Sequence, residues 1–231
     1  MGKGMLVDVS KCIACRGCQI ACKQWWKLPA VPSVNRGSHE NPADLTAHTW
    51  NRIAFSEIES DGTRKRLFTR KACNHCTQAV CVWVCPTFAR GYNNLGAVTI
   101  DPDRCIGCGR CGEFCPFGVP RLGSHNLSPR IAVGLYTPRL VSYSCAFCRD
   151  RLEKGGIPAC AKAFPTRAIQ CGEGGDLVKQ GRARVLALKG IHPRANFYGE
   201  KEMGGLKVLK VLTEEPDAHG LPEKPKMGNY P

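Results

Sequence analysis

The residues best suited to chemistry in this chain are its cysteines, of which there are 16 among 231 residues. They form four groups: Cys12, Cys15, Cys18 and Cys22; Cys73, Cys76, Cys81 and Cys85; Cys105, Cys108, Cys111 and Cys115; and Cys145, Cys148, Cys160 and, further on, Cys171. Cysteines this close in sequence bind a metal more readily than they pair with one another, because a disulfide needs a specific Cα separation and geometry. The spacing therefore predicts metal centres rather than a disulfide scaffold.

The first and third groups share the spacing C-x2-C-x2-C-x3-C, which is the iron–sulfur ligand run of bacterial ferredoxins. Upstream, "LVDVSKCIACRGC" aligns with "TIDPDRCIGCGRC", and Asp8 and Asp101 each lie four residues before the first cysteine. Each copy predicts a short strand, a turn and a ligand loop. Small residues such as Ala14 and Gly107 would let the backbone approach cluster sulfides. Zinc is the alternative metal, although two C-x2-C pairs suit a zinc site better than this triple spacing does.

The second and fourth groups form another repeat, in which a C-x2-C pair and a longer gap precede a closing residue and Pro-Thr. The closing segments are "CVWVCPT" and "CAKAFPT", so Phe164 lies where the repeat has Cys85. Cys171 follows seven residues later in "RAIQCG", which we expect to be a short strand returning toward the site. We hypothesise that Cys171 supplies the missing thiolate. The alternatives are a three-iron cluster, a ligand other than cysteine, or a buried cysteine without metal.

No catalytic constellation accompanies the cysteines. The sequence has no phosphate-binding loop, no Ser/His/Asp arrangement and no carboxylate pair that suggests a pocket. His75, inside the second group, could donate a hydrogen bond to a sulfide but is not expected to be a ligand. Trp25 and Trp26 fit packing or a subunit interface better than an electron path. We therefore expect electron transfer rather than catalysis.

The cysteine runs and the segments around them resemble the iron–sulfur (beta) subunits of molybdenum- or tungsten-pterin oxidoreductases, and among these the beta subunits of formate dehydrogenases. The segments that carry the resemblance are "CIACRGCQIACKQWW", "GSHENPADL", "CRDRLEKGGIPAC", "FYGEKEMGGLKVLKVL" and "GLPEKP". The similarity covers nearly the whole chain. The cysteine spacings are specific for four-cluster electron-transfer subunits, whereas the formate assignment depends on the flanking segments.

The resemblance implies an α+β fold of two ferredoxin-like modules with extensive loops, an inserted hairpin and a C-terminal extension. One module combines residues 1–24 with 140–175, and the other spans 70–139. The inserted hairpin region is 25–69, and the extension is 176–231. Within each module the last cysteine of each run binds the other cluster, as in two-cluster ferredoxins.

Four [4Fe-4S] clusters follow from the resemblance, each with its own ligand set. The implied sets are Cys12, Cys15, Cys18 and, in place of Phe164, Cys171 (cluster 1, alternatively [3Fe-4S]); Cys73, Cys76, Cys81 and Cys115 (cluster 2); Cys105, Cys108, Cys111 and Cys85 (cluster 3); and Cys145, Cys148, Cys160 and Cys22 (cluster 4).

The remaining segments carry local signals of structure. Asp61-Gly62, between "TWNRIAFSEIES" and "TRKRLFTRK", predicts a hairpin. "DLVKQGRARVLALKGI" predicts a helix with Asp176 near its start, and "LKVLKVL" alternates like a half-buried strand. We expect the Pro-rich tail "LPEKPKMGNYP" to wrap over a surface.

The formal net charge of +14 would by itself suggest a nucleic-acid partner. Four clusters with their thiolates would contribute roughly −8 to −12, so the excess of Lys and Arg fits compensation of buried anions better. Few aromatic residues are interleaved with the basic ones, and we expect no nucleic-acid partner. A zinc-stabilised nucleic-acid-binding module is the alternative from a different class. We see no secretory signal before Cys12 and no stretch near 18 apolar residues, so we expect no direct membrane span.

The resemblance implies a non-catalytic electron-transfer subunit of a formate dehydrogenase heterodimer or larger complex. Its clusters would carry electrons between a large catalytic subunit, which holds a molybdenum or tungsten bis-pterin, and a cytochrome, a membrane-anchor subunit or another acceptor. The alternatives change the complex to a polysulfide, arsenate, nitrate or sulfoxide reductase or a hydrogenase-type complex. The resemblance points to the periplasm, reached by co-export with a signal-bearing partner, and the cytoplasm is the alternative.

Overall fold

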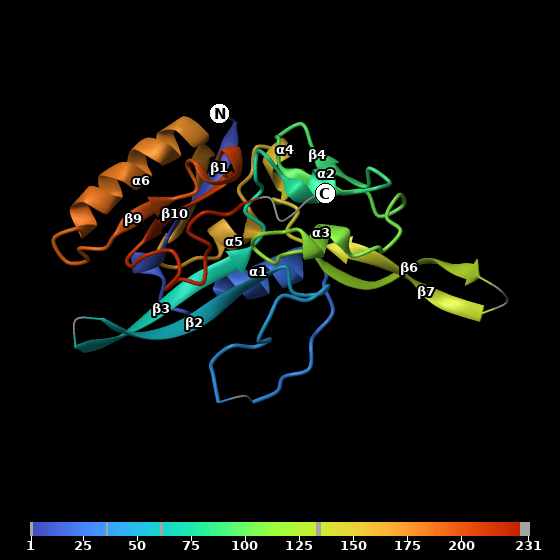
Figure 1. The fold of residues 1–231 in the computed structure, drawn as a ribbon, viewed down its shortest axis with the longest axis horizontal. Coiled ribbons are helices and arrows are strands. Elements are labelled where there is room, and N and C mark those ends of the chain that lie inside the picture. The colour runs from blue at the N-terminus through green and yellow to red at the C-terminus, as the bar shows by residue number, and fades with distance from the viewer. Residues whose placement is uncertain (1, 36, 61, 133–134, 227–231) are drawn as a thin grey trace.

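The computed structural model describes residues 2–35, 37–60, 62–132 and 135–226, in which short helices alternate with strands (Figure 1). The helices are α1 (Gly17–Trp25), α2 (Val80–Trp83), α3 (Arg110–Glu113), α4 (Arg149–Glu153), α5 (Ala159–Lys162) and α6 (Gly174–Leu188), with 3-10 turns η1 (Val9–Lys11) and η2 (Glu202–Gly204). The strands are β1 (Lys3–Asp8), β2 (Asn51–Ser60), β3 (Thr63–Ala72), β4 (Arg90–Tyr92), β5 (Val98–Ile100), β6 (Arg121–Ala132), β7 (Leu135–Tyr143), β8 (Ile169–Glu173), β9 (Asn196–Tyr198) and β10 (Val208–Leu212). These elements agree with the predicted α+β class.

The largest sheet joins the two ends of the chain. Its strand order is β8-β1-β10-β9, with β1 antiparallel to β8 and parallel to β10. One face lies under α6 (Figure 1), where Leu6 and Leu209 are buried against the helix. Met5 faces the opposite core, which contains the buried cysteines Cys18 and Cys160. The sheet therefore separates a helix-covered side from a cysteine-rich side.

The segment 206–212 is more deeply buried than its alternation predicts. Every residue of β10 is buried, whereas the sequence indicates a half-buried strand. The reason is position, because β10 is an inner strand covered by α6 on one face and by the cysteine-rich core on the other. Lys210 lies on this strand, and its Nζ donates to Asn74 Oδ1 at 2.5 Å. The predicted helix and the strand "RAIQCG" are confirmed by α6, with Asp176 in its first turn, and by β8.

The C-terminal extension is integrated into the rest of the fold. It contributes β9 and β10 to the sheet that contains β1 and β8. It also contacts the second cysteine group, because the N–H groups of Lys207 and Val208 donate to the carbonyls of His75 and Asn74, each at 3.2 Å. Residues 227–231 of the predicted tail lie outside the described residues.

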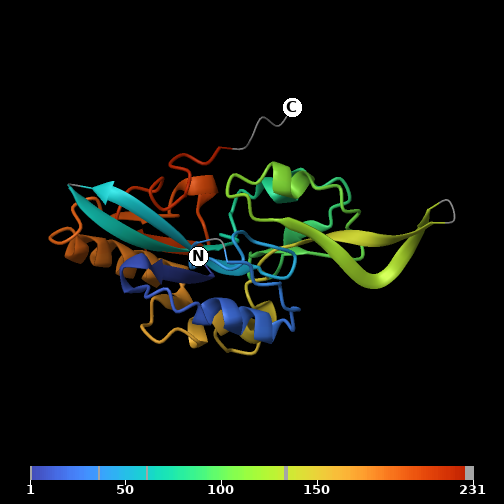
Figure 2. The same ribbon diagram turned by 90° about the horizontal axis from the view of Figure 1, so that it is seen from below.

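Two long hairpins leave the body of the molecule. In the first, β2 pairs with β3 from Asn51↔Ala72 to Ser60↔Thr63, which confirms the predicted hairpin, although Asp61 lies outside the described residues. The second, β6–β7, projects away from the body (Figure 2) and was not predicted. Proline within a strand argues against a strand, and this hairpin contains Pro129 and Pro138.

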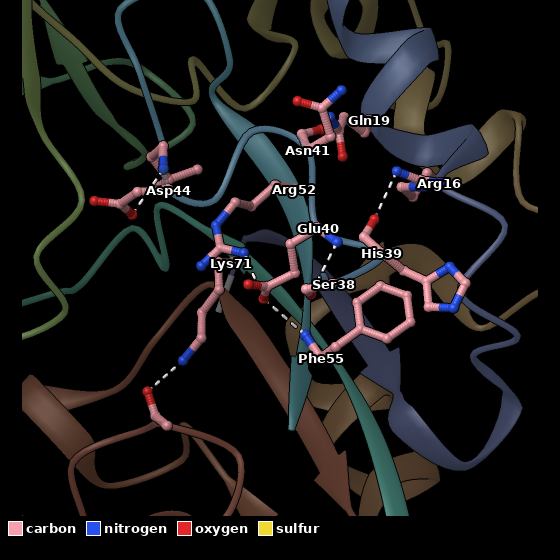
Figure 3. Close-up of polar contacts among 12 residues, drawn as sticks. Arg16, Gln19, Ser38, His39, Glu40, Asn41, Asp44, Arg52, Phe55 and Lys71 are labelled. Atoms are coloured by element: carbon pink, nitrogen blue, oxygen red, sulfur yellow. Dashed lines mark hydrogen bonds and ion pairs between the residues drawn. The ribbon is translucent and has the colours of Figure 1, made fainter. Parts of the chain in front are cut away.

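The loop between α1 and β2 is held by side-chain contacts (Figure 3). The Glu40 carboxylate accepts hydrogen bonds from Arg52 Nη1 and the Phe55 N–H, each at 2.9 Å. The His39 ring stacks on Phe55 with ring centroids 5.4 Å apart. Arg16, in the first ligand loop, donates to the His39 carbonyl at 2.7 Å. These contacts fix the insertion against the first ligand loop.

The strand-and-turn entry to the first and third cysteine groups is repeated, as predicted. At the end of β1, Asp8 Oδ1 accepts the Ser10 N–H at 3.0 Å. After β5, Asp101 Oδ1 accepts the Asp103 N–H at 2.9 Å. In both copies the aspartate closes the turn that leads into the ligand loop.

The link from each entry to a partner group is repeated as well. The Asp8 N–H donates to the Ala168 carbonyl at 2.8 Å, and the Asp101 N–H donates to the Ala89 carbonyl at 2.7 Å. Each acceptor lies four residues after the closing position of its group, which is Phe164 or Cys85. The fold therefore joins group one to group four and group three to group two. No helix in the described part of the chain is long and apolar enough to cross a bilayer.

Candidate iron–sulfur sites

Several of the buried cysteines lie on short helices that pack in pairs. α1 carries Cys18 and Cys22 and packs against α5, which carries Cys160. α2 and α3, which carry Cys81 and Cys111, pack against each other in the same way. Each pair of helices brings one C-x2-C-x2-C run next to one cysteine group of the other repeat. Groups one and four therefore meet in one place, and groups two and three in another (Figure 1).

The second residue after each opening cysteine has a left-handed backbone. The φ angle is 56° at Ala14, 50° at His75, 71° at Gly107 and 58° at Phe147. Left-handed φ is uncommon outside glycine and rare for bulky side chains, so its repetition at four different residue types indicates one shared demand on the backbone. Neighbouring right- and left-handed residues turn successive N–H groups toward a common anion, as at many Fe–S sites. All four openings therefore fit the anionic sulfides of a cluster.

The closing turns of three groups are also alike. The N–H groups of Phe88, Gly118 and Arg167 donate to the carbonyls of Cys85, Cys115 and Phe164, respectively, and the three donors have φ of 51°, 55° and 53°. Phe164 thus keeps the backbone of a ligand position, although its side chain cannot bind iron.

Cys22 lies among the thiols of the fourth group. Burial raises the pKa of Cys22, and the nearby thiols of Cys145, Cys160 and Cys148 raise it further. Since burial penalises the thiolate, thiols this close lose their protons together only when a metal takes up the charge. The structure therefore brings together the four residues that the resemblance combines as the ligands of cluster 4.

One thiol of the third group lies near the thiols of the second group. Burial raises the pKa of Cys76 to about 12, with further contributions from the thiols of Cys115 and Cys81. Burial likewise raises the pKa of Cys73, and the thiols of Cys81 and Cys76 raise it further. These four residues are the implied ligands of cluster 2.

The third group shares a small cavity with Cys85 of the second group. The cavity lining includes Cys85, Cys105, Cys108 and Cys111. Burial raises the pKa of Cys85, but hydrogen bonds to its sulfur outweigh burial and lower the pKa below its ordinary value. The donors are the backbone N–H groups of Arg90, Thr87 and Ala89 and the Thr87 hydroxyl. The backbone therefore favours a thiolate at Cys85 before any metal is considered.

The first group is gathered around a fully buried thiol. Cys18 is 0 % exposed, and burial raises its pKa to about 12 against the lowering effect of Arg70. The thiols of Cys160 and Cys12 add to the increase. Cys15, by contrast, is exposed. The first group therefore has one ligand at the surface and one deep in the core.

Cys171 and Phe164 both belong to the core that contains Cys18. β8 pairs Cys171 with Met5, whose side chain faces the same core. Burial raises the pKa of Cys171 and the thiol of Cys160 raises it further, whereas no thiol of the first group in the described chain contributes to that shift. The structure thus brings Cys171 to the junction of groups one and four. That Cys171 binds cluster 1 stays a prediction.

His75 lies inside the second cysteine group, and that it donates to a cluster without binding iron stays a prediction. It is fully buried, packs edge-on to Phe147 with ring centroids 4.9 Å apart, and has no hydrogen bond of normal geometry at either ring nitrogen within the described chain. Burial lowers the pKa of His75 to about 3, so its imidazole is neutral and keeps one N–H donor.

Among the described residues, no group of three or more His, Cys, Asp or Glu side chains is arranged to hold a single metal ion.

Sequence reasoning missed two buried arginines, Arg70 and Arg90, which are 3 % and 2 % exposed and lie among the cysteines. Arg70 belongs to a strand rich in basic residues, so nothing in its sequence distinguishes it from its exposed neighbours. Only the fold reveals that it points inward.

Comparisons with known proteins agree with this chemistry. Residues 11–89 match the family model of a 4Fe-4S dicluster domain, and residues 98–121 match that of a 4Fe-4S binding domain. Both models describe iron–sulfur binding rather than zinc binding, which confirms the iron–sulfur prediction over the zinc alternative.

Similarity to individual proteins extends along nearly the whole chain. The chain is 36% identical to the iron-sulfur subunit of the nitrate-inducible formate dehydrogenase of Escherichia coli, over 96% of this chain and 73% of that protein. It is 31% identical to formate dehydrogenase 2 subunit beta (cytochrome c-553) of Nitratidesulfovibrio vulgaris, over 93% of this chain and 95% of that protein. It is also 31% identical to the formate dehydrogenase subunit beta of Megalodesulfovibrio gigas, over 85% and 88% of the two chains.

Proposed function

Because the chain belongs to the iron–sulfur subunits of formate dehydrogenases, we propose that it conducts electrons through four [4Fe-4S] clusters between a catalytic subunit and an acceptor. An iron–sulfur subunit of this family carries electrons and does not itself oxidise formate. The observation that carries the proposal is the similarity over 96% of the chain together with the paired gathering of the cysteine groups. When bound, each cluster accepts and releases single electrons, while this chain's residues hold the thiolates, exclude water and supply compensating charge.

The proposed architecture is two ferredoxin-like modules that exchange ligands internally. Groups one and four form one module, and groups two and three form the other. The repeated hydrogen bonds from Asp8 to Ala168 and from Asp101 to Ala89 support this pairing. The thiols around Cys22 and Cys76, and the cavity shared by Cys85 and the third group, support ligand sets 2, 3 and 4 as given above.

For cluster 1 we propose Cys12, Cys15, Cys18 and Cys171 as ligands. Cys171 and Cys12 pack against the same core, which supports the proposal, and Phe164 in that core leaves the first group one thiolate short. If Cys171 does not bind, the site holds either a three-iron cluster, with one iron fewer, or a cubane with a ligand other than cysteine, whose iron content Cys171→Ala would leave unchanged.

The partner that fits best is a catalytic alpha subunit, because the relatives' names include subunit beta of a formate dehydrogenase. A cytochrome is the acceptor that we propose, since the name of the Nitratidesulfovibrio vulgaris relative contains cytochrome c-553. We expect the molybdenum or tungsten bis-pterin only in the catalytic partner.

One experiment tests the proposed function as a whole. The complex is purified anaerobically by a tag on this chain and analysed for subunits, iron, molybdenum and tungsten. The expected result is a large partner, about sixteen irons per copy of this chain beyond those of the partner, and formate-dependent reduction of a cytochrome. A chain that is isolated with zinc, or a complex that reduces another substrate and does not oxidise formate, would refute the proposal.

The compartment is a separate proposal, which follows from the resemblance alone. We propose export of the folded subunit together with a signal-bearing partner. Cell fractionation with and without deletion of the catalytic subunit tests it. The expected result is periplasmic protein that stays in the cytoplasm when the partner is deleted, and cytoplasmic protein in both strains would refute it.

A further inference from the structure

A guanidinium group is buried beside the cysteines of each pair of groups. Arg70 lies on β3 and is 3 % exposed, and Arg90 begins β4 and is 2 % exposed. A buried charge is costly unless an opposite charge or hydrogen bonds compensate it. In the described chain, the groups that favour the charged form of both arginines are cysteines and not carboxylates. Their compensation therefore comes from the cysteine sites.

The two arginines are surrounded by equivalent cysteines. Burial lowers the pKa of each guanidinium, but nearby thiols outweigh this effect and raise it: Cys160, Cys145, Cys18 and Cys22 for Arg70, and Cys111, Cys81 and Cys73 for Arg90. In the repeats, Cys160 corresponds to Cys81, Cys145 to Cys73, and Cys18 to Cys111. Each arginine thus lies between ligands that we assign to the two different clusters of its module.

The two arginines reach this place from positions that do not correspond. Arg90 lies five residues after Cys85, where the other repeat has Ile169. Arg70 lies three residues before Cys73, where the other repeat has Ser142. The two arginines are therefore not copies of one position in the repeat, although each lies among the cysteines of its own module.

The local contacts show how each charge is held. Arg90 donates from Nη2 to Ser142 Oγ at 2.6 Å and from Nη1 to Ser144 Oγ at 3.2 Å. Ser142 Oγ in turn accepts the Cys111 thiol at 3.1 Å, which ties this guanidinium to a proposed ligand of cluster 3. Arg70 lowers the pKa of the Cys145 thiol, against the raising effect of burial, and its Nε and Nη1 have no hydrogen-bond partner within the described chain. Within the described chain, Arg70 therefore has two buried donors for which the protein supplies no acceptor.

Resting on the ligand sets proposed above, we propose that Arg70 and Arg90 are positioning charges that raise the reduction potentials of the clusters beside them, clusters 1 and 4 for Arg70 and clusters 2 and 3 for Arg90. Each cluster becomes more negative on reduction, and an arginine stays protonated throughout the working pH range. In a buried site this attraction is weakly screened, so it favours the reduced form. Because one charge acts on two clusters, it raises both potentials together and leaves the difference between them little changed.

The test is a redox titration of the purified complex followed by EPR, with iron analysis of every variant. Arg70→Gln and Arg90→Gln remove the charges singly. We expect each to reduce the equilibrium constant for reduction of two clusters by about tenfold, which is about 59 mV for one electron. The two variants should shift different pairs of clusters.

Matched controls separate charge from packing. Arg66→Gln removes a charge from the same strand at a side chain that is 72% exposed and paired with Glu57, and we expect unchanged potentials. Arg70→Lys and Arg90→Lys keep the positive charge but lack the planar guanidinium. Compared with the glutamine variants, they should restore most of the lost reduction potential of the clusters.

Three results would overturn the proposal: unshifted potentials in both glutamine variants at full iron content, the same pair of clusters shifted by both, or an equal shift in Arg66→Gln. If a glutamine variant loses iron, the lysine variant decides, because iron loss there as well means that the residue acts by packing and refutes the charge role. A wild-type complex without four clusters would instead refute the proposed function, so the two failures are distinguishable.

Discussion

The second and fourth cysteine groups have the same closing turn but different closing side chains. Cys85 and Phe164 each accept a hydrogen bond from the residue three positions later, and that residue has a positive φ in both turns. Seven residues after the closing position, the second group has Tyr92 and the fourth has Cys171. An aromatic residue and a cysteine have thus exchanged places between two copies within one chain.

The comparison shows that the backbone, rather than the sulfur, fixes this turn. Phe164 is 6 % exposed, so its ring occupies core space without changing the turn. Tyr92 lies near Cys81 and Cys76, and its hydroxyl donates to the Thr77 carbonyl at 2.6 Å. Cys171 offers a thiol at the corresponding place. A ligand can therefore move to another position while the fold around it stays constant.

The largest effect on iron content is expected at positions where the second and fourth groups both have cysteine. Cys81→Ala and Cys160→Ala each remove a proposed ligand at corresponding positions of α2 and α5. Each variant should lose one cluster, which is about four irons per chain by metal analysis, because only a C-x2-C pair and one exchanged thiolate remain, whereas loss of Cys171 leaves the unbroken run of the first group. Strongly unequal losses would mean that the two copies are not equivalent.

A smaller loss of iron is expected at the position where the second and fourth groups differ. Cys171→Ala should remove about one iron and produce the EPR signal of an oxidised three-iron cluster, because the first group then has three thiolates. Tyr92→Phe is the matched control at the corresponding position and should leave the iron content unchanged. If Cys171→Ala keeps all its iron and its spectra, Cys171 is not a ligand.

Reversing the exchange should cancel that loss. In the Cys171→Ala background, Phe164→Cys returns a thiol to a turn that already has the ligand backbone. We expect full iron content and the loss of the three-iron EPR signal in the double variant. Persistence of that signal would show that the closing turn of group four no longer reaches the cluster.

The smallest expected effect is a pH dependence of stability that arises in the C-terminal extension, which has no counterpart in the other module. His219 accepts the Glu214 N–H at Nε2 and pairs with Thr69 Oγ1 through Nδ1, and burial lowers its pKa to about 4 from 6.5. Since the folded pKa lies below the unfolded value, this contribution to stability is complete above pH 6.5 and falls as the pH drops toward 4. Between pH 6.5 and 5 the free energy of unfolding should fall by about 2 kcal/mol.

Urea unfolding across that pH range measures this dependence. His219→Gln, which cannot be protonated, should show a flatter profile between pH 6.5 and 5. Equal slopes in the two proteins would assign the acid sensitivity to other groups.

Much of this molecule could be predicted from the sequence, because its strongest signals are local. The cysteine spacings indicated iron–sulfur binding, and the first hairpin and α6 were indicated by Asp61-Gly62 and by the helix pattern after Asp176. Each depends on residues near one another in the chain, where turn chemistry and periodicity act directly.

The rest depends on contacts between distant segments. The alternation of β10 does not reveal that the strand is covered on both faces, and Lys210 in it looks exposed until the sheet order is known. The sequence did not predict the hairpin β6–β7, because its prolines argue against strands there. Arg70 and Arg90 face the cysteines only because hairpins and ligand loops from different groups meet, which no single segment of sequence encodes.

The number of clusters is the most direct test of this account. Iron and acid-labile sulfide are measured in the anaerobically purified complex, with Mössbauer spectroscopy to separate cubane from three-iron clusters and Cys171→Ala measured in parallel. We expect about sixteen irons and about sixteen sulfides in this chain, all in cubanes, and about one iron fewer in the variant. About fifteen irons in the wild type, or about sixteen that the substitution leaves unchanged, would contradict a fourth cubane closed by Cys171.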